Sequence, residues 1–533
     1  MRISCGGSSW GGNTGKWDLL LNNSGVVAMH MALTHLDTVI IFDQTEAGRS
    51  GYRLRHCANG SDSSCWAHSV EYDITSNTIR PLTLKTDTWC SSGTFLSDGT
   101  LLQTGGNLKG FRKIRHFRPC SDRSCDWNES ETHLADKRWY SSTQILPEDD
   151  DRVIVVGGRD SFSYEFVPKS NANEGAFYLP FLRRTHHRSR EENNLYPFLH
   201  ISSDGNLFIF ANEDSILLDY KRGKVAKTFP RMPGGGPRNY PSTGSLVMLP
   251  LDHANNYQKV EIMVCGGAPS GAYRAAHDND VFMTGLSSCG RMVITDTKPR
   301  WEMEELPAPR LMSDMLLLPT GSILLINGAT HGAAGWDCAR NASLHPYLYK
   351  PDGIKGERFT VLRPAEVPRV YHSSAILLPD GRILVAGSNT HPNYIFRRVD
   401  FPTELKLQTF TPHYMLPFFD RKRPTNLTIE SILGSATVRH REEFRIRLRL
   451  GRRPAKVMEF HMYAPPFTTH SFSMNQRMVK LKYKRLVREE GGEVVVTVVA
   501  PPSSVVAPSG YYLLSVVNGG IPSKGFWMRL IRG

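Results

Sequence analysis

The segment from Gly93 to Gly106 decides the fold, and it reads Gly-Thr-Phe-Leu-Ser-Asp-Gly-Thr-Leu-Leu-Gln-Thr-Gly-Gly. Two apolar stretches flank an Asp-Gly pair, which supplies the positive φ that a tight hairpin turn needs. The segment from Ser374 to Gly387 repeats this pattern as Ser-Ala-Ile-Leu-Leu-Pro-Asp-Gly-Arg-Ile-Leu-Val-Ala-Gly. A hairpin that recurs along a chain predicts an array of equivalent structural units.

Five weaker copies of the hairpin bring the number of units to seven. They span residues 29–42, 143–158, 200–211, 245–267 and 315–328, and successive copies begin 46 to 70 residues apart. The strands are too apolar for an exposed sheet, and stacking four-stranded units in a ring buries both faces. A repeat of about 50 residues is typical of kelch propellers. No amphipathic helix separates the strands, which excludes an α/β fold. Residues 1–419 are therefore predicted to form an all-β, seven-bladed kelch-type β-propeller.

A second domain begins where the composition changes, near Arg421-Lys422-Arg423-Pro424. Residues 420–533 contain 20 Lys and Arg against 8 Asp and Glu, so they carry +12 of the net +13. Residues 444–450 alternate between apolar residues and arginine, and 494–499 and 511–517 read as further strands. Short strands of this kind over about 110 residues are typical of an immunoglobulin-like (E-set) sandwich.

Cysteines and glycosylation signals favour an oxidising compartment. Cys57 with Cys65 and Cys120 with Cys125 read as short-loop disulfides, since neither pair has the two-residue spacing of a zinc site. The sequence does not fix the pairing of Cys5, Cys265, Cys289 and Cys338. Acceptor motifs for N-glycosylation occur at five asparagines: Asn22, Asn59, Asn128, Asn341 and Asn426. We therefore expect a secreted, apoplastic or cell-wall protein.

The N-terminus does not fit that expectation directly. Residues 1–7 lead into a Gly/Ser/Asn stretch without an apolar core, so no signal peptide is present. We expect a truncated or misassigned start; the alternative is a protein that is not secreted. The longest uncharged candidate for a membrane span, residues 315–336, is interrupted by proline and glycine, which excludes a lipid-facing helix.

The basic second domain favours a polyanionic partner, and a simply solvated face explains the charge equally well. An extracellular location disfavours nucleic acid and leaves acidic cell-wall polysaccharide as the expected contact. We expect a monomer without a membrane partner. The pair His186-His187 lies in a basic stretch, which we interpret as an exposed loop rather than a metal site.

Candidate functional residues lie in four segments: 88–93 with Cys90, 138–142 with Tyr140, 369–374 with Tyr371 and His372, and 465–471 with His470. The first three occupy corresponding positions at the start of predicted blades, and such positions converge toward the axis of a ring. Each residue also has a structural interpretation. Cys90 reads as a small buried residue or a disulfide partner, and Tyr140 as a core aromatic residue.

Taken together, these residues resemble the galactose oxidase and glyoxal oxidase family of copper-radical oxidases. The segments Glu-Asn-Asn-Leu-Tyr-Pro-Phe-Leu-His (192–200) and Ala-Pro-Pro-Phe-Thr-Thr-His-Ser-Phe-Ser-Met (464–474) are most similar to the plant glyoxal oxidase branch. The resemblance implies one copper per chain, bound by Tyr140, Tyr371, His372 and His470. It also implies a thioether between Cys90 and Tyr140 that makes the Tyr140 ring easier to oxidise. Imidazole and phenolate donors suit Cu(II).

The resemblance further implies a two-electron oxidation of substrate, in which Tyr371 takes the proton and the Tyr140 radical takes a hydrogen atom. Dioxygen then accepts the electrons and becomes hydrogen peroxide. In the galactose oxidase branch a tryptophan covers the cross-linked tyrosine, whereas residues 157–162 here read Gly-Gly-Arg-Asp-Ser-Phe. This departure favours small aldehydes of the glyoxal or methylglyoxal type, oxidised to carboxylic acids. Two alternatives stay open: an oxidase of primary alcohols or galactose-type sugars, and a non-catalytic, carbohydrate-binding kelch propeller.

Overall fold

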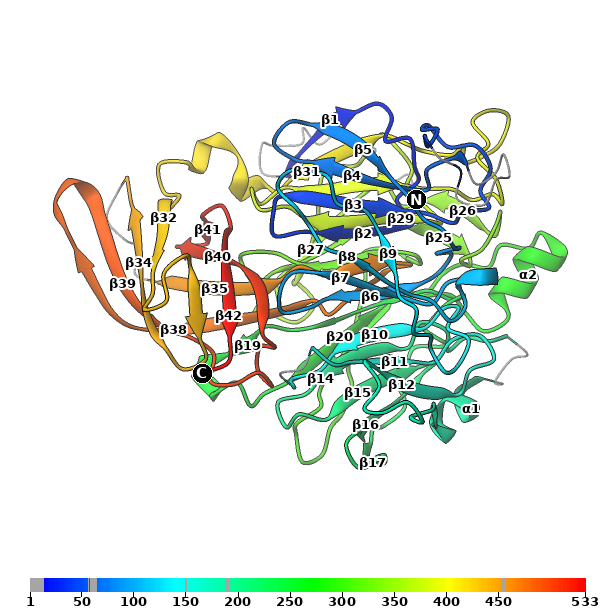
Figure 1. Ribbon diagram of the computed structural model, residues 1–533, viewed down its shortest axis with the longest axis horizontal. Helices are drawn as coiled ribbons and strands as arrows, with labels where there is room; N and C mark the ends of the chain where they lie inside the picture. Colours follow the sequence, from blue (N-terminus) through cyan, green and yellow to red (C-terminus); the bar gives the residue numbers. More distant parts are fainter. Residues whose placement is uncertain (1–13, 56, 58–64, 149–150, 187–190, 452–456) are drawn as a thin grey trace, which may run out of the picture.

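The computed structural model describes residues 14–533 except for 56, 58–64, 149–150, 187–190 and 452–456. Seven antiparallel sheets form the propeller, on the right in Figure 1, and a second β-domain lies to the left. We number the blades 1 to 7 in chain order. This architecture confirms the predicted all-β propeller followed by a sandwich-type domain.

The predicted hairpins form the two inner strands of every blade. The inner pairs are β2 (His30–Leu33) with β3 (Thr38–Phe42), β6 (Ser92–Phe95) with β7 (Leu101–Thr104), β10 (Ser142–Ile145) with β11 (Val153–Val156), β14 (Phe198–Ile201) with β15 (Leu207–Ala211), β18 (Ser245–Met248) with β20 (Glu261–Cys265), β23 (Asp314–Leu317) with β24 (Ile323–Ile326), and β29 (Ser373–Leu377) with β30 (Ile383–Gly387). These strands are buried almost throughout, because neighbouring blades cover both of their faces.

Two outer strands complete each blade. In blades 1 to 7 they are β4 (Ser69–Asp73) and β5 (Thr78–Leu82), β8 (Ile114–Phe117) and β9 (Asn128–Glu129), β12 (Ser163–Val167) and β13 (Phe177–Tyr178), β16 (Asp214–Asp219) and β17 (Lys224–Thr228), β21 (Ser288–Val293) and β22 (Glu302–Glu305), β27 (Tyr347–Tyr349) and β28 (Phe359–Val361), and β31 (Leu407–Thr411) with β1 (Lys16–Leu21). Blade 7 thus takes its outermost strand from the start of the chain, and this pairing closes the ring.

Additional elements decorate the propeller. Blade 6 carries a separate hairpin, β25 (Ala329–Gly332) with β26 (Ala339–Ala342). Two short helices, α1 (Pro180–His186) and α2 (Ala272–Asn279), lie at the right-hand side of Figure 1. Among the described residues, neither these nor any other helix has the length and apolar character needed to cross a membrane.

The second domain is a curled sandwich with the strand order β32-β34-β39-β38-β35-β40-β42-β33. Its main strands are β32 (Thr425–Glu430), β33 (Thr437–Arg439), β34 (Glu443–Arg449), β35 (Met458–Ala464), β38 (Arg477–Arg488), β39 (Glu493–Val499), β40 (Gly510–Asn518) and β42 (Phe526–Ile531). The short strand β41 (Ile521–Pro522) pairs with β40. The alternation predicted for residues 444–450 is present, because Phe444, Ile446 and Leu448 are buried between more exposed neighbours.

Two strand pairings join the domains. The short propeller strand β19 (Leu251–Asp252) runs parallel to β38 of the second domain. A hairpin of the second domain, β36 (Phe467–Thr469) and β37 (Phe472–Met474), pairs with β2 of blade 1, where Thr469 stands opposite His30. The turn of this hairpin, with His470, therefore lies at the inner edge of the propeller.

The predicted disulfides Cys57–Cys65 and Cys120–Cys125 are present. A third, Cys265–Cys289, was not predicted; it links paired positions on β20 and β21. Cys90 and Cys338 are free and buried, while Cys5 lies outside the described residues.

Candidate metal centre

A left-handed corner precedes the inner strand of six blades. The corner residues have φ between 49° and 63°: Cys90, Tyr140, Tyr196, Thr243, Met312 and His372. Non-glycine residues adopt this conformation rarely and at an energetic cost, and such strain concentrates at functional sites. Four of the six side chains, those of Cys90, Tyr140, Tyr196 and His372, contact His470. The repeated corner is thus the local structure that directs side chains toward the ring centre.

Backbone hydrogen bonds link these corners between blades. The Tyr140 N–H donates to the Cys90 carbonyl and the Tyr196 N–H donates to the Tyr140 carbonyl, each over 2.9 Å. The Met312 N–H likewise donates to the Thr243 carbonyl over 2.7 Å. The positions of Cys90 and Tyr140 relative to each other are therefore set by main-chain contacts.

Buried arginines stabilise the backbone around these corners by hydrogen bonds. In four blades an arginine Nη1 donates to the carbonyl of a glycine that ends or directly follows the second strand, over 2.6 to 2.8 Å; the pairs are Arg115–Gly105, Arg138–Gly157, Arg238–Gly266 and Arg369–Gly387. At Gly266 a Cβ atom would lie 2.1 Å from the Arg310 carbonyl oxygen of the next blade, so only glycine fits there. This packing explains why the sequence repeat ends in Gly-Gly.

The five residues expected from the sequence lie together around His470. The Cys90 Sγ lies 3.3 Å from the His470 Nε2. The His470 ring centroid lies 5.9 Å from that of Tyr140, 5.6 Å from that of Tyr371 and 5.0 Å from that of His372. Potential ligand atoms of Cys90, His372 and His470 all lie within 4.8 Å of one another.

A tyrosine that the sequence analysis did not select completes the group. The Tyr140 hydroxyl donates to the Tyr240 hydroxyl over 3.2 Å, and the hydroxyls of Tyr240 and Tyr371 lie 3.0 Å apart. The Tyr240 ring also stacks on that of Tyr140 at 4.5 Å. A sequence signal for it exists, because Arg238-Asn239-Tyr240 repeats the Arg-x-Tyr spacing of residues 138–140 and 369–371.

Burial determines the protonation of the site. Desolvation raises the pKa of the Cys90 thiol well above its usual value, an effect that a hydrogen bond with the Tyr140 side chain partly offsets. Burial likewise raises the pKa values of Tyr140 and Tyr371, with contributions from neighbouring Cys90 and Tyr240. Desolvation lowers the pKa values of His372 and His470 well below the usual range, so both imidazoles are neutral at pH 7.

The donor set fits a metal ion. Within the described part of the chain, neither ring nitrogen of the buried His372 has a hydrogen-bond partner. An imidazole left in this state is costly unless a ligand satisfies it. The neutral His372 and His470 rings offer nitrogen lone pairs, and the phenols of Tyr140 and Tyr371, whose ring centroids lie 5.9 and 5.6 Å from that of His470, add oxygen donors. Such nitrogen and oxygen donors suit Cu(II).

Arg159 covers the ring of Tyr140. Its guanidinium carbon lies 5.2 Å from the Tyr140 centroid and 4.4 Å from that of Trp139, and the side chain pairs with Glu192 over 2.7 Å. The segment 157–162, which lacks the tryptophan of the galactose oxidase branch, therefore covers the tyrosine with a cation instead.

A second group of metal-ligating types lies nearby and comprises Asp160, His186 and Glu192. The Glu192 carboxylate is already bound by Arg159 over 2.8 Å, which disfavours a cation there. The expectation of an exposed loop at His186 was wrong. His186 is 8% exposed and ends α1, where its ring packs on Phe162. His187 lies outside the described residues.

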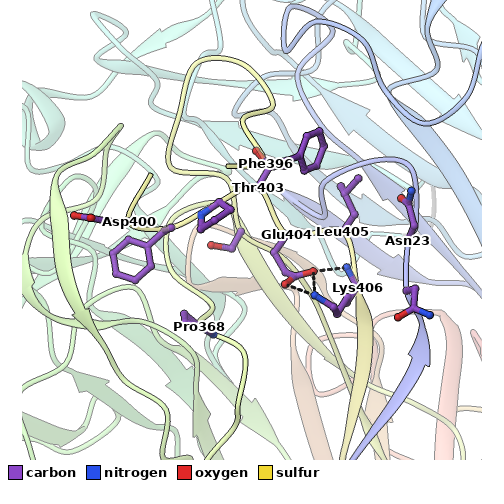
Figure 2. A pocket seen from close by; sticks show the side chains of 12 residues that line it. Asn23, Pro368, Phe396, Asp400, Thr403, Glu404, Leu405 and Lys406 are labelled. Carbon is purple, nitrogen blue, oxygen red and sulfur yellow. Dashed lines mark hydrogen bonds and ion pairs between the residues drawn. The ribbon is translucent and has the colours of Figure 1, made fainter. Parts of the chain in front are cut away.

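A separate hollow of about 410 Å³ lies behind the corner of blade 7 (Figure 2). Within it, Lys406 pairs with Glu404 over 3.2 Å. Ser388 belongs to its lining and accepts a hydrogen bond from the Val370 N–H over 3.1 Å. None of the five predicted site residues lines this hollow, so it does not give access to their side chains.

The fold and the site define a propeller with an early-set domain that contributes a buried histidine to the ring centre. The family model described as Glyoxal oxidase N-terminus matches residues 29–414, and Galactose oxidase-like, Early set domain matches residues 423–530. The chain belongs to the glyoxal oxidase family.

Named relatives agree with this assignment. The chain is 44% identical to aldehyde oxidase GLOX of Vitis pseudoreticulata, covering 97% of each chain. It is 42% identical to aldehyde oxidase GLOX1 of Arabidopsis thaliana, covering 97% of this chain and 85% of that one. A copper-bound fungal alcohol oxidase of the AA5 family shares the fold with a TM-score of 0.72 at 18% identity, over 97% of this chain and all of the other.

Proposed function

We propose that the protein is a copper-radical oxidase that converts small aldehydes of the glyoxal or methylglyoxal type to carboxylic acids, with dioxygen reduced to hydrogen peroxide. The observation that supports this most directly is the grouping of Cys90, Tyr140, Tyr371 and His372 around His470. A binding propeller has no need for a buried thiol, phenols and unpartnered imidazole nitrogens at one point.

In this proposal, copper is held by His372, His470 and the phenol oxygens of Tyr140 and Tyr371, and it supplies Lewis acidity and one-electron redox chemistry when bound. The protein supplies the remaining groups. Cys90 lies beside Tyr140, and a thioether between them would lower the potential at which the Tyr140 ring loses an electron. Tyr371, hydrogen-bonded to Tyr240, is positioned to take a proton from the substrate.

Aldehyde substrates are favoured over sugars by two observations. Relatives of at least 42% identity over 97% of this chain are named aldehyde oxidases. In addition, the Arg159 guanidinium lies over both Tyr140 and Trp139, so a cation stands next to the Tyr140 ring. Hydrogen-bond donors next to the reacting centre suit the oxygens of a small aldehyde or its hydrate.

Mass spectrometry of copper-treated, aerated protein tests the cofactor. We expect the tryptic peptide with Cys90 to be joined to that with Tyr140, at two hydrogens less than their summed mass. Cys90→Ser is the control and should give separate peptides. Unmodified Cys90 and Tyr140 in folded, copper-loaded protein would remove the oxidase proposal. Peroxide release from glyoxal and methylglyoxal, against galactose and primary alcohols, then decides the substrate class.

We propose that the protein functions outside the cell. Four acceptor asparagines lie among the described residues, and all four are exposed: Asn22, Asn128, Asn341 and Asn426. Three disulfides are consistent with an oxidising compartment. Expression through a secretory route should give a protein whose mass falls on treatment with an N-glycosidase, and an unchanged mass would contradict the proposal.

Acidic polysaccharide is the proposed contact of the second domain, with weak affinity. Arg447 is paired with Glu430, Glu489 and Glu493, which neutralises the middle of the arginine-bearing face. Arg445 remains exposed. We expect retention on immobilised pectate at low salt that disappears near physiological ionic strength. Retention that persists in high salt would rule out this electrostatic contact.

A further inference from the structure

Three tryptophans stand in ring-to-ring contact beside Tyr140. The Trp139 ring centroid lies 5.0 Å from that of Tyr140 and 5.0 Å from that of Trp89. Trp89 in turn stacks on Trp336 at 5.1 Å, with an interplanar angle of 16°. A continuous series of aromatic rings therefore leads from Tyr140 to Trp336.

The backbone brings these rings together from three blades. Trp89 and Trp139 directly precede the corner residues of blades 2 and 3, and Trp336 comes from the loop between β25 and β26 of blade 6. Gly335 has φ of 146°, and a Cβ there would lie 2.9 Å from a Tyr273 ring carbon. The Asp337 N–H ties the loop to blade 7 by donating to the Thr390 carbonyl over 2.8 Å. Trp336 is thus held in place by a loop that needs glycine at position 335 and is hydrogen-bonded to blade 7.

Charge and stacking distinguish the members of the series. The Arg159 cation lies over Trp139 and Tyr140, and a nearby positive charge makes removal of an electron from a ring harder. Trp89 and Trp336 are stacked face to face, and two parallel indoles share a positive charge, which makes its formation easier. An oxidising equivalent is therefore held more stably on the Trp89–Trp336 pair than on Trp139.

Solvent exposure also distinguishes Tyr140 from the three tryptophans. Tyr140 is 2% exposed, so a dissolved redox agent cannot contact its ring. All three tryptophans are partly exposed. A solute that exchanges electrons with the protein by contact therefore meets an indole before it meets the tyrosine.

We propose that Trp336, Trp89 and Trp139 form an electron-transfer path between the protein surface and Tyr140. It rests on the proposed function, in which Tyr140 must be oxidised by one electron. In a single electron-transfer event along this path, an outer-sphere oxidant such as hexachloroiridate(IV) gains an electron from Trp336. Trp89, Trp139 and Tyr140 then each pass one electron outward. The net change is one electron gained by the oxidant and one electron lost by Tyr140, which in the copper-free protein also releases its hydroxyl proton. That proton passes to the Tyr240 oxygen, 3.2 Å away, and on to water.

Stopped-flow oxidation of the full-length, copper-loaded protein tests the path. We expect the tyrosyl radical signal to form at least about tenfold more slowly in Trp336→Phe and Trp89→Phe than in the unaltered protein. Trp301→Phe is the matched control, because this tryptophan lies on blade 5 with its indole N–H bound to the Pro230 carbonyl over 2.8 Å. Its rate should stay within about twofold of the unaltered protein. Equal rates in all four proteins would overturn the path.

A second measurement separates this proposal from the proposed function. Copper-free, full-length protein is exposed to a flash-generated ruthenium(III) tris-bipyridine oxidant, and transient absorbance follows indole and tyrosyl radicals. The tyrosyl component that Tyr140→Phe removes should grow as the indole signal decays, and Trp336→Phe should slow that growth. Growth unaffected by Trp336→Phe overturns the path, whether or not the copper-loaded protein releases peroxide. Failure of peroxide release together with slowed growth would reject the oxidase and retain the path.

Discussion

At the scale of single residues, the site depends on groups that burial keeps neutral. Tyr240 is the least expected of them, because it joins the two phenols that the proposed mechanism requires. The resemblance to known oxidases assigned roles to Cys90, Tyr140, Tyr371, His372 and His470, but it gave none to a tyrosine of blade 5. The Arg-x-Tyr spacing marks this tyrosine in the sequence, but its contacts with both phenols become evident only when the ring brings blades 3, 5 and 7 together.

Tyr240→Phe should therefore impair turnover while preserving the fold. The variant keeps the ring that stacks on Tyr140 and loses only the hydroxyl that bridges Tyr140 and Tyr371. We expect kcat to fall about tenfold, since the loss of a buried hydrogen bond is worth about 1.4 kcal/mol. Peroxide-release kinetics measure this effect, and near-ultraviolet circular dichroism checks the fold. Unchanged kcat would show that the bridge has no part in the reaction.

Asp314 predicts a pH dependence of stability. Burial raises its pKa to about 8, and its carboxylate accepts one hydrogen bond, from the Asn327 Nδ2 over 2.8 Å. The pKa in the unfolded chain is about 3.9. The folded state therefore favours the protonated form, and this contribution to stability is complete below about pH 4 and is lost as the pH rises through 8.

Asp314→Asn should flatten that dependence, because the amide stays neutral. Chemical denaturation at pH 5 and pH 8 should show a smaller loss of unfolding free energy in the variant than in the unaltered protein. Asp352→Asn, at an exposed position, is the control and should keep the original slope. If the unfolding free energy changed equally with pH in all three proteins, Asp314 would have no part in the pH dependence.

At the scale of the element, each blade contains a hairpin, six of the seven add a left-handed corner, and most add a buried arginine. The sequence repeat predicts the hairpins because the Asp-Gly turn and the apolar strands leave a local pattern. It does not predict which corner side chains meet, since Cys90, Tyr196 and Met312 occupy the same local structure. Nor does it predict that Arg159 lies over Tyr140 or that Trp336 stacks on Trp89. Each contact joins residues that are far apart in the sequence or belong to different structural elements.

Replacing a corner arginine should lower the stability of the protein in every blade that has one. It should lower copper affinity only where the corner carries a metal ligand. Arg369→Met leaves the Gly387 and Lys406 carbonyls without their donors, and we expect a loss of about 3 kcal/mol in unfolding free energy. Because Arg369 supports the corner with Tyr371 and His372, copper affinity should fall too.

Arg310→Met is the matched control for this prediction. Arg310 is also buried and donates to the Leu325 carbonyl over 3.2 Å, but its corner residue is Met312. We expect a comparable loss of stability with unchanged copper affinity, measured by competition with a chromogenic chelator. Equal losses of copper affinity in both variants would show that the effect is global.

At the scale of the whole molecule, the two domains share one site. The hairpin of β36 and β37 pairs with β2 and carries His470 into the ring, and β19 pairs with β38. The family resemblance predicts this contribution from the second domain. Composition alone does not predict this contribution. The change in net charge near residue 420 marks the domain boundary but gives no information about contacts between the domains.

Copper should therefore stabilise both domains in a single transition. At free copper 100 times above Kd, binding adds about 2.7 kcal/mol to the unfolding free energy. Differential scanning calorimetry should show one transition that moves upward with copper and returns on chelation. His470→Ala should remove most of this shift, and His133→Ala, at an exposed position, should retain it. Two separate transitions, of which copper moves only one, would contradict the shared site.

The late position of the hairpin with His470 also has a consequence for biogenesis. Synthesis proceeds from the N-terminus, so blades 1 to 6 are complete in the nascent chain well before this hairpin emerges. Until it docks, nothing from the second domain covers the free thiol of Cys90, while six other cysteines form their three disulfides. A chain that folds slowly in an oxidising compartment thus risks capturing Cys90 in a wrong disulfide. We therefore expect the yield of active protein to depend on how quickly the last hundred residues arrive.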